Sequence, residues 1–283
     1  MSPLSIALKD RLAALLEREV DDTYGCSTID YFQHTVFLPL HYCDQVNDTQ
    51  EWCDRCHGGF NELARERICE WLYHVIDHFN YDREIVAITL NYFDRYLSKK
   101  DADEYLRNSN TNLVPQCVAI AALNIVLKVS FSRIDHLPLL IELSQKLFSP
   151  TEINNMESSI LSRLSWKLSP PTSLAFLVDF IPFMAKVSPC ANLKHHDVSE
   201  IAQFLVELSV CDYYFVRKKL KPSSIALASL LNAIDIVFPA SSADCKMVTN
   251  ILLSNLRTHL GIEFCEQTKQ CRERLEQIYR ATE

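Results

Sequence analysis

Glycine is scarce in this sequence, with only four among 283 residues. A fold rich in β-hairpins needs glycine at its tight turns, and a phosphate-binding loop needs several glycines close together. The scarcity argues against both. The sequence also lacks a Walker loop, the HExxH and GxSxG motifs and the signature sequences of protein kinases. We therefore expect that the protein is not an enzyme and uses no cofactor.

An excess of basic residues is missing too. Lys and Arg number 28 against 36 for Asp and Glu, and the formal net charge is −8. Proteins that bind nucleic acid or anionic membranes usually carry a basic face. No stretch is apolar and long enough for a transmembrane helix, and the first twenty residues are too charged for a signal peptide. We expect neither nucleic acid nor a membrane among the partners.

The eleven cysteines are an odd number and are scattered along the chain. This pattern favours reduced thiols and a location in the nucleus, the cytoplasm or both. Cys53, Cys56 and His57 spell the attachment motif of c-type haem, which we discount because no export signal precedes it. Together with Cys43 they would suffice as soft ligands for zinc. A loop with reduced thiols and a zinc site both stay open, and we favour the loop without a metal.

Apolar residues recur every three or four positions along most of the chain, the spacing of amphipathic helices. We expect helices over Leu4–Val20, Arg65–Phe79, Asp82–Ser98, Leu113–Lys128, Ser173–Met184, Asp197–Phe215, Pro222–Val237, Ala243–Leu260 and Glu263–Ala281, with two more that begin near Asp135 and Ser149. No stretch reads convincingly as a strand. The run from Ser169 to Thr172 contains two prolines and marks a domain boundary.

Two local signals support these helix limits. Ser149 and Glu152 have the spacing of a capping box, which starts a helix, and Gly261 is well placed to end one. The sequence therefore predicts an all-α protein in three parts. An N-terminal helix and an irregular segment occupy 1–60, a first five-helix domain occupies 61–169, and a second occupies 170–283.

One helical stretch occurs twice. Leu113–Lys128 is apolar on all sides except at Asn124, and a helix of this kind is buried. Leu220–Asp235 repeats it, with Leu, Pro, Ala, Ala and Leu at matching places. Upstream, Leu90–Leu97 matches Leu208–Phe215 in the same way. Solenoid repeats recur within about 20–50 residues, so this longer period predicts two duplicated domains.

Five short motifs, in this order along the chain, resemble those of cyclins. They are Arg65 with Trp71 six residues later, Asp94–Ser98, the alanine-rich helix that ends in Lys128, Met156–Glu157, and Leu164–Trp166 followed by Pro170–Thr172. The resemblance implies two tandem cyclin folds preceded by an N-terminal helix that packs on the second fold. It also implies a regulatory subunit that binds and activates a cyclin-dependent protein kinase in cell-cycle control.

The resemblance assigns roles to single residues. Lys128 and Glu157 fall where cyclins contact the kinase. Without the resemblance, an internal ion pair or a lysine that reaches past apolar surface would be the better explanation. Arg65 and Asp94 match a pair that we interpret as structural, because buried charges need partners.

A second group of positions matches the patch where cyclins dock kinase substrates or inhibitors. That patch is usually apolar, and here it reads Ala64, Arg67, Ile68 and Trp71. The alanine and the arginine predict weak docking of hydrophobic motifs, and Trp71 alone would be read as a core residue. Cyclins often continue after the kinase-contacting lysine with an aromatic residue and two acids. The residues Val129–Phe131 depart from this pattern and predict an unusual choice of kinase.

The same duplicated fold also serves transcription factors and scaffold proteins that bind DNA or peptides, and this is the alternative function. A DNA-binding version should carry a basic surface and often a zinc ribbon ahead of the fold. This chain has an excess of acids and no CxxC…CxxC arrangement. We therefore favour kinase regulation.

Overall fold

A computed structural model describes residues 6–26, 62–98, 114–184, 191–238 and 242–282. All regular structure in these ranges is helical, and they contain no β-strand. The chain divides into two compact units. We call Thr23–Ser169 the first unit, while in the second unit Met1–Asp22 joins Pro170–Glu283.

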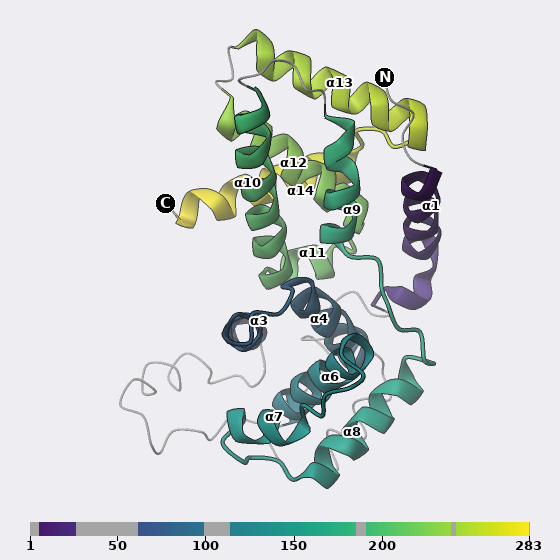
Figure 1. The fold of residues 1–283 in the computed structure, drawn as a ribbon, viewed down its shortest axis with the longest axis vertical. Coiled ribbons are helices and arrows are strands. Elements are labelled where there is room, and N and C mark those ends of the chain that lie inside the picture. Colours follow the sequence, from purple (N-terminus) through teal and green to yellow (C-terminus); the bar gives the residue numbers. More distant parts are fainter. Residues whose placement is uncertain (1–5, 27–61, 99–113, 185–190, 239–241, 283) are drawn as a thin grey trace. The chain divides into compact units, whose positions relative to one another are not determined.

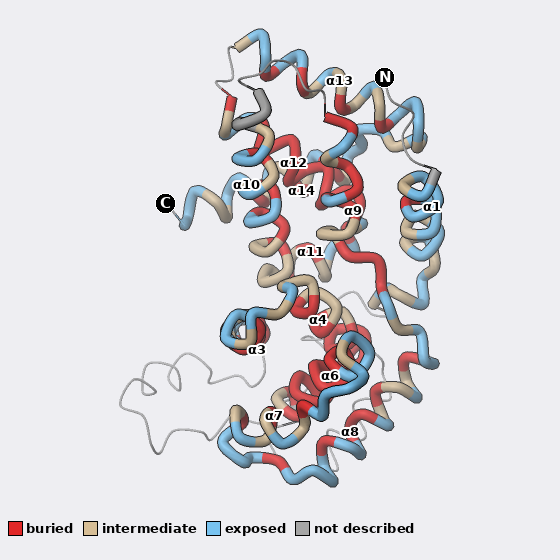
Figure 2. Tube along the Cα trace, in the orientation of Figure 1, coloured by how far each residue is buried: buried red, intermediate tan, exposed pale blue. Residues whose placement is uncertain are grey.

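The first unit is built around a single buried helix (Figure 1). Its helices are α3 (Glu62–His78), α4 (Glu84–Leu97), α6 (Val114–Ser130), α7 (Leu137–Leu143) and α8 (Pro150–Arg163). Helix α6 packs against α4, α7 and α8, while α3 packs on α4. Every residue of α6 from Cys117 to Leu127 is buried (Figure 2), as the apolar run with Asn124 as its one polar residue predicts.

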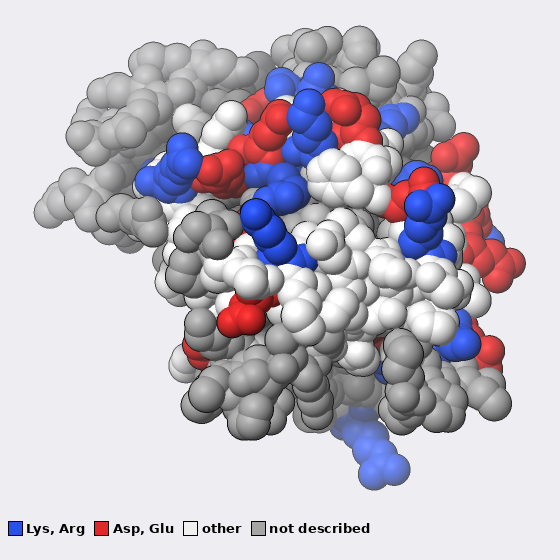
Figure 3. All heavy atoms as spheres, turned by 90° about the horizontal axis from the view of Figure 1, so that it is seen from above, with Lys and Arg blue, Asp and Glu red and all other residues white. Residues whose placement is uncertain are grey.

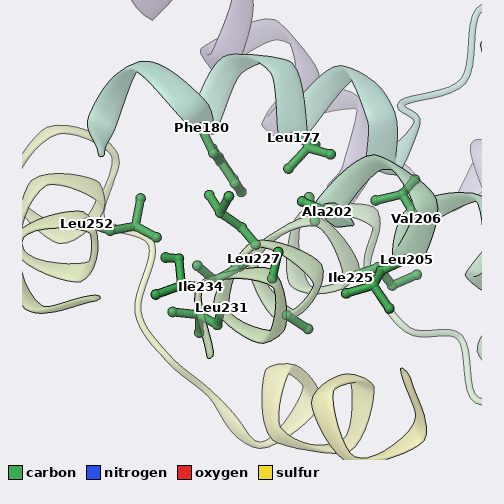
Figure 4. Close-up of a cluster of buried hydrophobic side chains, with 14 of the residues drawn as sticks. Leu177, Phe180, Ala202, Leu205, Val206, Ile225, Leu227, Leu231, Ile234 and Leu252 are labelled. Atoms are coloured by element: carbon green, nitrogen blue, oxygen red, sulfur yellow. The ribbon is translucent and has the colours of Figure 1, made fainter. Parts of the chain in front are cut away.

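The second unit repeats this plan around α12. Its helices are α1 (Ile6–Val20), α9 (Ser173–Phe180), α10 (Ala191–Cys211), α11 (Tyr213–Arg217), α12 (Pro222–Val237), α13 (Ala243–Leu260) and α14 (Glu266–Thr282), with the 3-10 helix η3 (Ile181–Phe183) after α9. All residues of α12 from Ser223 to Ile234 are buried. Leucine and isoleucine side chains of α12 meet Phe180 of α9 and Ala202 of α10 in one apolar cluster (Figure 4).

The N-terminal helix α1 packs with the second unit, against α9, α12 and α13. Leu12 is fully buried there, and Arg11 donates from Nε to the buried carboxylate of Asp179 at 2.8 Å. Glu19 accepts hydrogen bonds from the backbone N–H and the hydroxyl of Ser223, at 2.6 and 2.7 Å. Burial raises the pKa of Glu19, against the effect of these two hydrogen bonds. The sequence-based division places this helix in a separate segment, 1–60. In the structure α1 packs with the second unit.

One predicted helix, Asp197–Phe215, is two helices in the structure. Helix α10 ends at Cys211, and Asp212 caps α11 by accepting a hydrogen bond from the N–H of Tyr214 at 2.9 Å. An aspartate favours this capping role over a helix interior because its side chain competes for backbone N–H groups. The matching Asp94 lies inside α4, so the two copies share sequence here but differ in local structure.

The predicted start of α8 and the predicted end of α13 are both confirmed. Ser149 Oγ accepts from Glu152 N at 3.3 Å, and Glu152 accepts from Ser149 N at 2.8 Å, which completes the capping box. Gly261 follows α13 with φ +65°. Most other reversals at helix ends lack a glycine. Among the described residues, seven other than glycine have positive φ, namely Asn80, Gln145, Lys146, Ser165, Trp166, Ser169 and Lys219.

These helix ends predict where glycine would stabilise the protein. Lys219, exposed after α11, has φ +50°, whereas its exposed neighbour Lys218 has φ −82°. A left-handed conformation costs an L-residue about 1–2 kcal/mol, and glycine adopts it freely at an entropic cost of about 0.5–1 kcal/mol. We expect Lys219→Gly to leave the second unit equally stable or up to about 1 kcal/mol more stable. Lys218→Gly should destabilise it by about 1 kcal/mol.

The two lysine variants are compared by urea unfolding. All three tryptophans of the sequence lie between residues 23 and 169, so tryptophan fluorescence reports on the first unit. Circular dichroism reports the unfolding of both units. Unfolding of the second unit is therefore the part of the circular-dichroism change that tryptophan fluorescence does not show. Equal destabilisation by both variants would contradict the prediction.

The capping box of α8 predicts a pH-dependent contribution to stability. Hydrogen bonds from the Ser149 backbone and hydroxyl lower the pKa of Glu152 from its usual 4.5. The contribution is therefore present above pH 4.5 and is lost as pH falls through the lowered pKa. We expect Ser149→Ala to reduce the free energy of unfolding by about 0.5–2 kcal/mol at pH 7, and by less below that pKa. Tryptophan fluorescence in urea measures this, with Ser162→Ala, exposed in the last turn of α8, as the control that should change little.

Candidate functional site

The structure brings Lys128 and Glu157 together at the end of α6. Lys128 lies in the last turn of α6, and Glu157 lies in the middle of α8, which packs on α6. Lys128 Nζ is 3.0 Å from Glu157 Oε1 and 2.8 Å from Oε2. The lysine side chain is 45% exposed and the glutamate side chain 10%. The pair is therefore anchored on the carboxylate and open to solvent on the ammonium side.

A third residue completes this group. Asn124, fully buried one turn before Lys128, donates from Nδ2 to Oε1 of Glu157. The sequence shows Asn124 as the one polar residue in a buried run but does not indicate its partner. The available signal was its spacing, since residues four apart share one face of a helix and Lys128 is four residues on.

Exposed apolar side chains lie at or just beyond the C-terminal ends of both helices that carry the pair. Val129, next to Lys128, is 56% exposed. Trp166, three residues beyond the end of α8, is 69% exposed and has φ +57°. A bulky aromatic residue in this conformation is rare, and such outliers gather at functional positions. The amide of Trp166 donates to the carbonyl of Leu161 at 3.0 Å, which fixes the turn after the helix.

An aromatic cluster holds the segment that follows Lys128. Phe131 stacks on Tyr81 with ring centroids 4.4 Å apart. Tyr81 Oη lies 3.0 Å from Nε2 of His136, which is buried at the start of α7. At Phe131 the sequence departs from the usual cyclin pattern, and its side chain packs on Tyr81 within the first unit.

Arg65 and Asp94 form a buried ion pair between α3 and α4. Arg65 Nε lies 2.9 Å from Oδ1 of Asp94, and Nη2 lies 2.8 Å from Oδ2. Both side chains are at most 4% exposed. Burial, with a smaller effect from the charge of Asp94, raises the pKa of the Cys26 thiol to about 12. This geometry supports the structural interpretation of the pair.

The four positions matched to a docking patch lie along one face of α3. Ala64 is buried, Ile68 and Trp71 are half-buried, and Arg67 is exposed. Trp71 therefore contributes both to the core and to the surface, and the docking role stays a prediction.

The proposed zinc ligands Cys43, Cys53, Cys56 and His57 lie outside the described residues. The seven described cysteines carry free thiols. Among the described residues, one group of metal-binding type has its ligand atoms within 4.8 Å of one another, namely His196, Asp197 and Glu200. All three are exposed on α10, where such groups are common without an ion. None of the described helices has the length and apolar character needed to cross a membrane.

Surface charge is mixed in sign on the face shown in Figure 3. Lys and Arg side chains lie among Asp and Glu side chains, around a broad area of uncharged residues. A protein that binds DNA would instead gather its basic residues into a patch or stripe. This face therefore gives no support to the DNA-binding alternative.

Two family models match nearly the whole chain. The model of the cyclin N-terminal domain matches residues 33–169, and that of the cyclin C-terminal domain matches residues 171–283. The chain belongs to the cyclin family. The predicted all-α fold with two tandem cyclin domains is thereby confirmed.

Several plant cyclins are similar to this cyclin. Cyclin-B2-1 of Arabidopsis thaliana is 29% identical over 173 residues, which cover 61% of this chain and 36% of the relative. G2/mitotic-specific cyclin-1 of Antirrhinum majus is 31% identical over 173 residues, or 61% and 33% of the two chains. Cyclin-A3-3 of Arabidopsis thaliana is 27% identical over 224 residues, or 79% and 64%. The matched part is thus only about a third of the length of the first two relatives.

A solved structure shows the same fold. The X-ray structure of a viral cyclin from herpesvirus saimiri superposes with a TM-score of 0.50. The superposition covers 75% of this chain and 87% of the viral protein, at 18% sequence identity.

The first unit offers a direct test of the structural role of Arg65. Removing one partner of a buried ion pair leaves the other charge unpaired, so Arg65→Met should destabilise the first unit by about 3–5 kcal/mol. Arg83 and Asp77 join through the same four atom types at 2.8 and 2.6 Å, but their side chains are more than 40% exposed. Arg83→Met should therefore cost less than about 1 kcal/mol. Tryptophan fluorescence in urea compares the two, and equal effects would reject a role that depends on burial.

Proposed function

We propose that this cyclin binds a cyclin-dependent protein kinase through the surface around Lys128 and Glu157 and holds the kinase in its active conformation. The observation that carries the proposal is the ion pair at the end of α6, in which the carboxylate of Glu157 is buried and the ammonium group of Lys128 is exposed. Two of the three N–H groups of Lys128 are directed to Glu157, which leaves one donor for a partner. Exposure of the lysine places this donor at the surface.

The apolar neighbours support a protein partner over a small ligand. Val129 and Trp166 expose large apolar side chains next to Lys128 and beyond the end of α8. Protein interfaces typically combine a desolvated aromatic anchor with a few oriented polar groups. A partner that covers the ammonium group of Lys128 would also exclude water from the ion pair and strengthen its hydrogen bonds.

Activation then needs no catalytic group from the cyclin. A kinase is active when its αC helix is turned inward, so that its own Lys–Glu ion pair forms. A regulator that binds this state better than the inactive state shifts the equilibrium by the difference in binding free energy. A difference of about 5.5 kcal/mol moves a population from 1:99 to 99:1. The surface around Lys128 is suited to such selective binding because it presents its charged groups in a fixed geometry.

The test uses a panel of purified, monomeric cyclin-dependent kinases. We expect at least one to bind the chain and to phosphorylate a protein substrate faster in its presence. Lys128→Ala combined with Glu157→Ala should weaken binding by about 2–5 kcal/mol, which is at least about thirtyfold in Kd. The helical content, followed by circular dichroism, should stay unchanged.

The control removes another pair of opposite charges from the same protein. Glu276 and Arg280 form an exposed ion pair on α14, and replacing both with alanine leaves the net charge as it is in the test variant. This control should bind the kinase like the wild type. If no kinase in the panel binds or is activated, the proposed function is wrong. If the Lys128 and Glu157 double variant binds normally, the function stands and the site is wrong.

A further inference from the structure

Asn124 is a costly residue for the core of the first unit. It is fully buried, and among the described residues its Oδ1 has no hydrogen-bond partner. A buried acceptor without a partner destabilises a fold, while an apolar side chain of the same shape carries no such penalty. Packing alone therefore does not explain an asparagine at this position.

The duplicated helix shows what packing requires there. Residues of α6 and α12 that match in sequence differ by 107 in number, as Leu113 and Leu220 do, so Asn124 matches Leu231. Leu231 is buried in the apolar cluster around α12 (Figure 4). Leucine and asparagine have the same number of side-chain atoms and the same branching. An apolar residue thus serves the core of the second unit at this place.

The amide of Asn124 holds Glu157 from the inner side. Oε1 of Glu157 accepts from both Asn124 and Lys128, and Oε2 accepts from Lys128. The last torsion of a glutamate side chain has a broad preference, so the carboxylate needs partners on both sides to keep one orientation. Lys128 is half exposed and supplies the outer partner. Asn124 supplies the buried one.

We propose that Asn124 is a positioning residue, which orients the Glu157 carboxylate and through it the outward N–H of Lys128 for the kinase. The inference rests on the proposed function above. Fixing these groups before binding removes ordering that association would otherwise require, and so it increases affinity. The unpartnered Oδ1 is then retained for recognition and not for stability.

The experiment uses Asn124→Leu in the full chain and the kinase from the panel that binds the wild type best. We expect a rise in Kd of about tenfold, equal to about 1.4 kcal/mol, while the urea midpoint of the first unit stays equal or increases. The matched control is Ser229→Ala in α12, which also removes a fully buried oxygen without a partner among the described residues. That variant should leave the Kd unchanged. If Asn124→Leu does not fold, the smaller Asn124→Ala takes its place.

A second measurement separates positioning from a general structural effect. In the Glu157→Ala background, the same Asn124→Leu change should alter the Kd by less than about twofold, because the side chain it orients is gone. A tenfold loss in both backgrounds, or no loss in either, would overturn the inference. A wild type that binds no kinase would instead refute the proposed function, and this inference with it.

Discussion

The first unit depends on the complete burial of one helix. Between Cys117 and Leu127 no residue of α6 faces solvent, so α4, α7 and α8 must enclose it. Each square ångström of apolar surface removed from water contributes about 25 cal/mol to stability. Lys128 follows directly on this stretch as the first exposed side chain. The most deeply buried stretch of α6 thus places the lysine, as the proposed binding site requires.

Burial distinguishes the ion pairs of the first unit more than their geometry does. Arg65 with Asp94 and Arg83 with Asp77 join through the same four atom types at nearly the same distances. The first pair is buried and the second is exposed to water. Loss of one charge is therefore expected to destabilise the fold strongly only in the first pair. Lys128 with Glu157 is intermediate, because only its carboxylate is enclosed. An ion pair open on one side is stable by itself and is still able to bind a partner.

The sequence predicts the helices and the buried α6 well because helical spacing and a long, almost wholly apolar run are local properties. It also indicates the start of α8 and the end of α13, where capping depends on residues close in sequence. It fails where an interaction is long-range or competes with helix propensity. Asp212 breaks a helical pattern by capping α11, and the partner of Asn124 lies 33 residues away on α8. The packing of α1 with the second unit is set by contacts such as Glu19 with Ser223, about 200 residues apart.

The duplication shows why the candidate site lies in the first unit alone. Lys128 matches Asp235 at the end of α12, by the same difference of 107. Arg272 of α14 pairs with Asp235 and donates from Nε to Asn232 Oδ1 at 2.8 Å, while Asn232 donates back to the Arg272 carbonyl at 3.0 Å. The charge at the end of α12 is thus neutralised by a helix of its own unit. At the end of α6 the charge is a lysine, which pairs with Glu157 of α8. The group proposed to bind the kinase therefore has no counterpart of the same charge in the second copy.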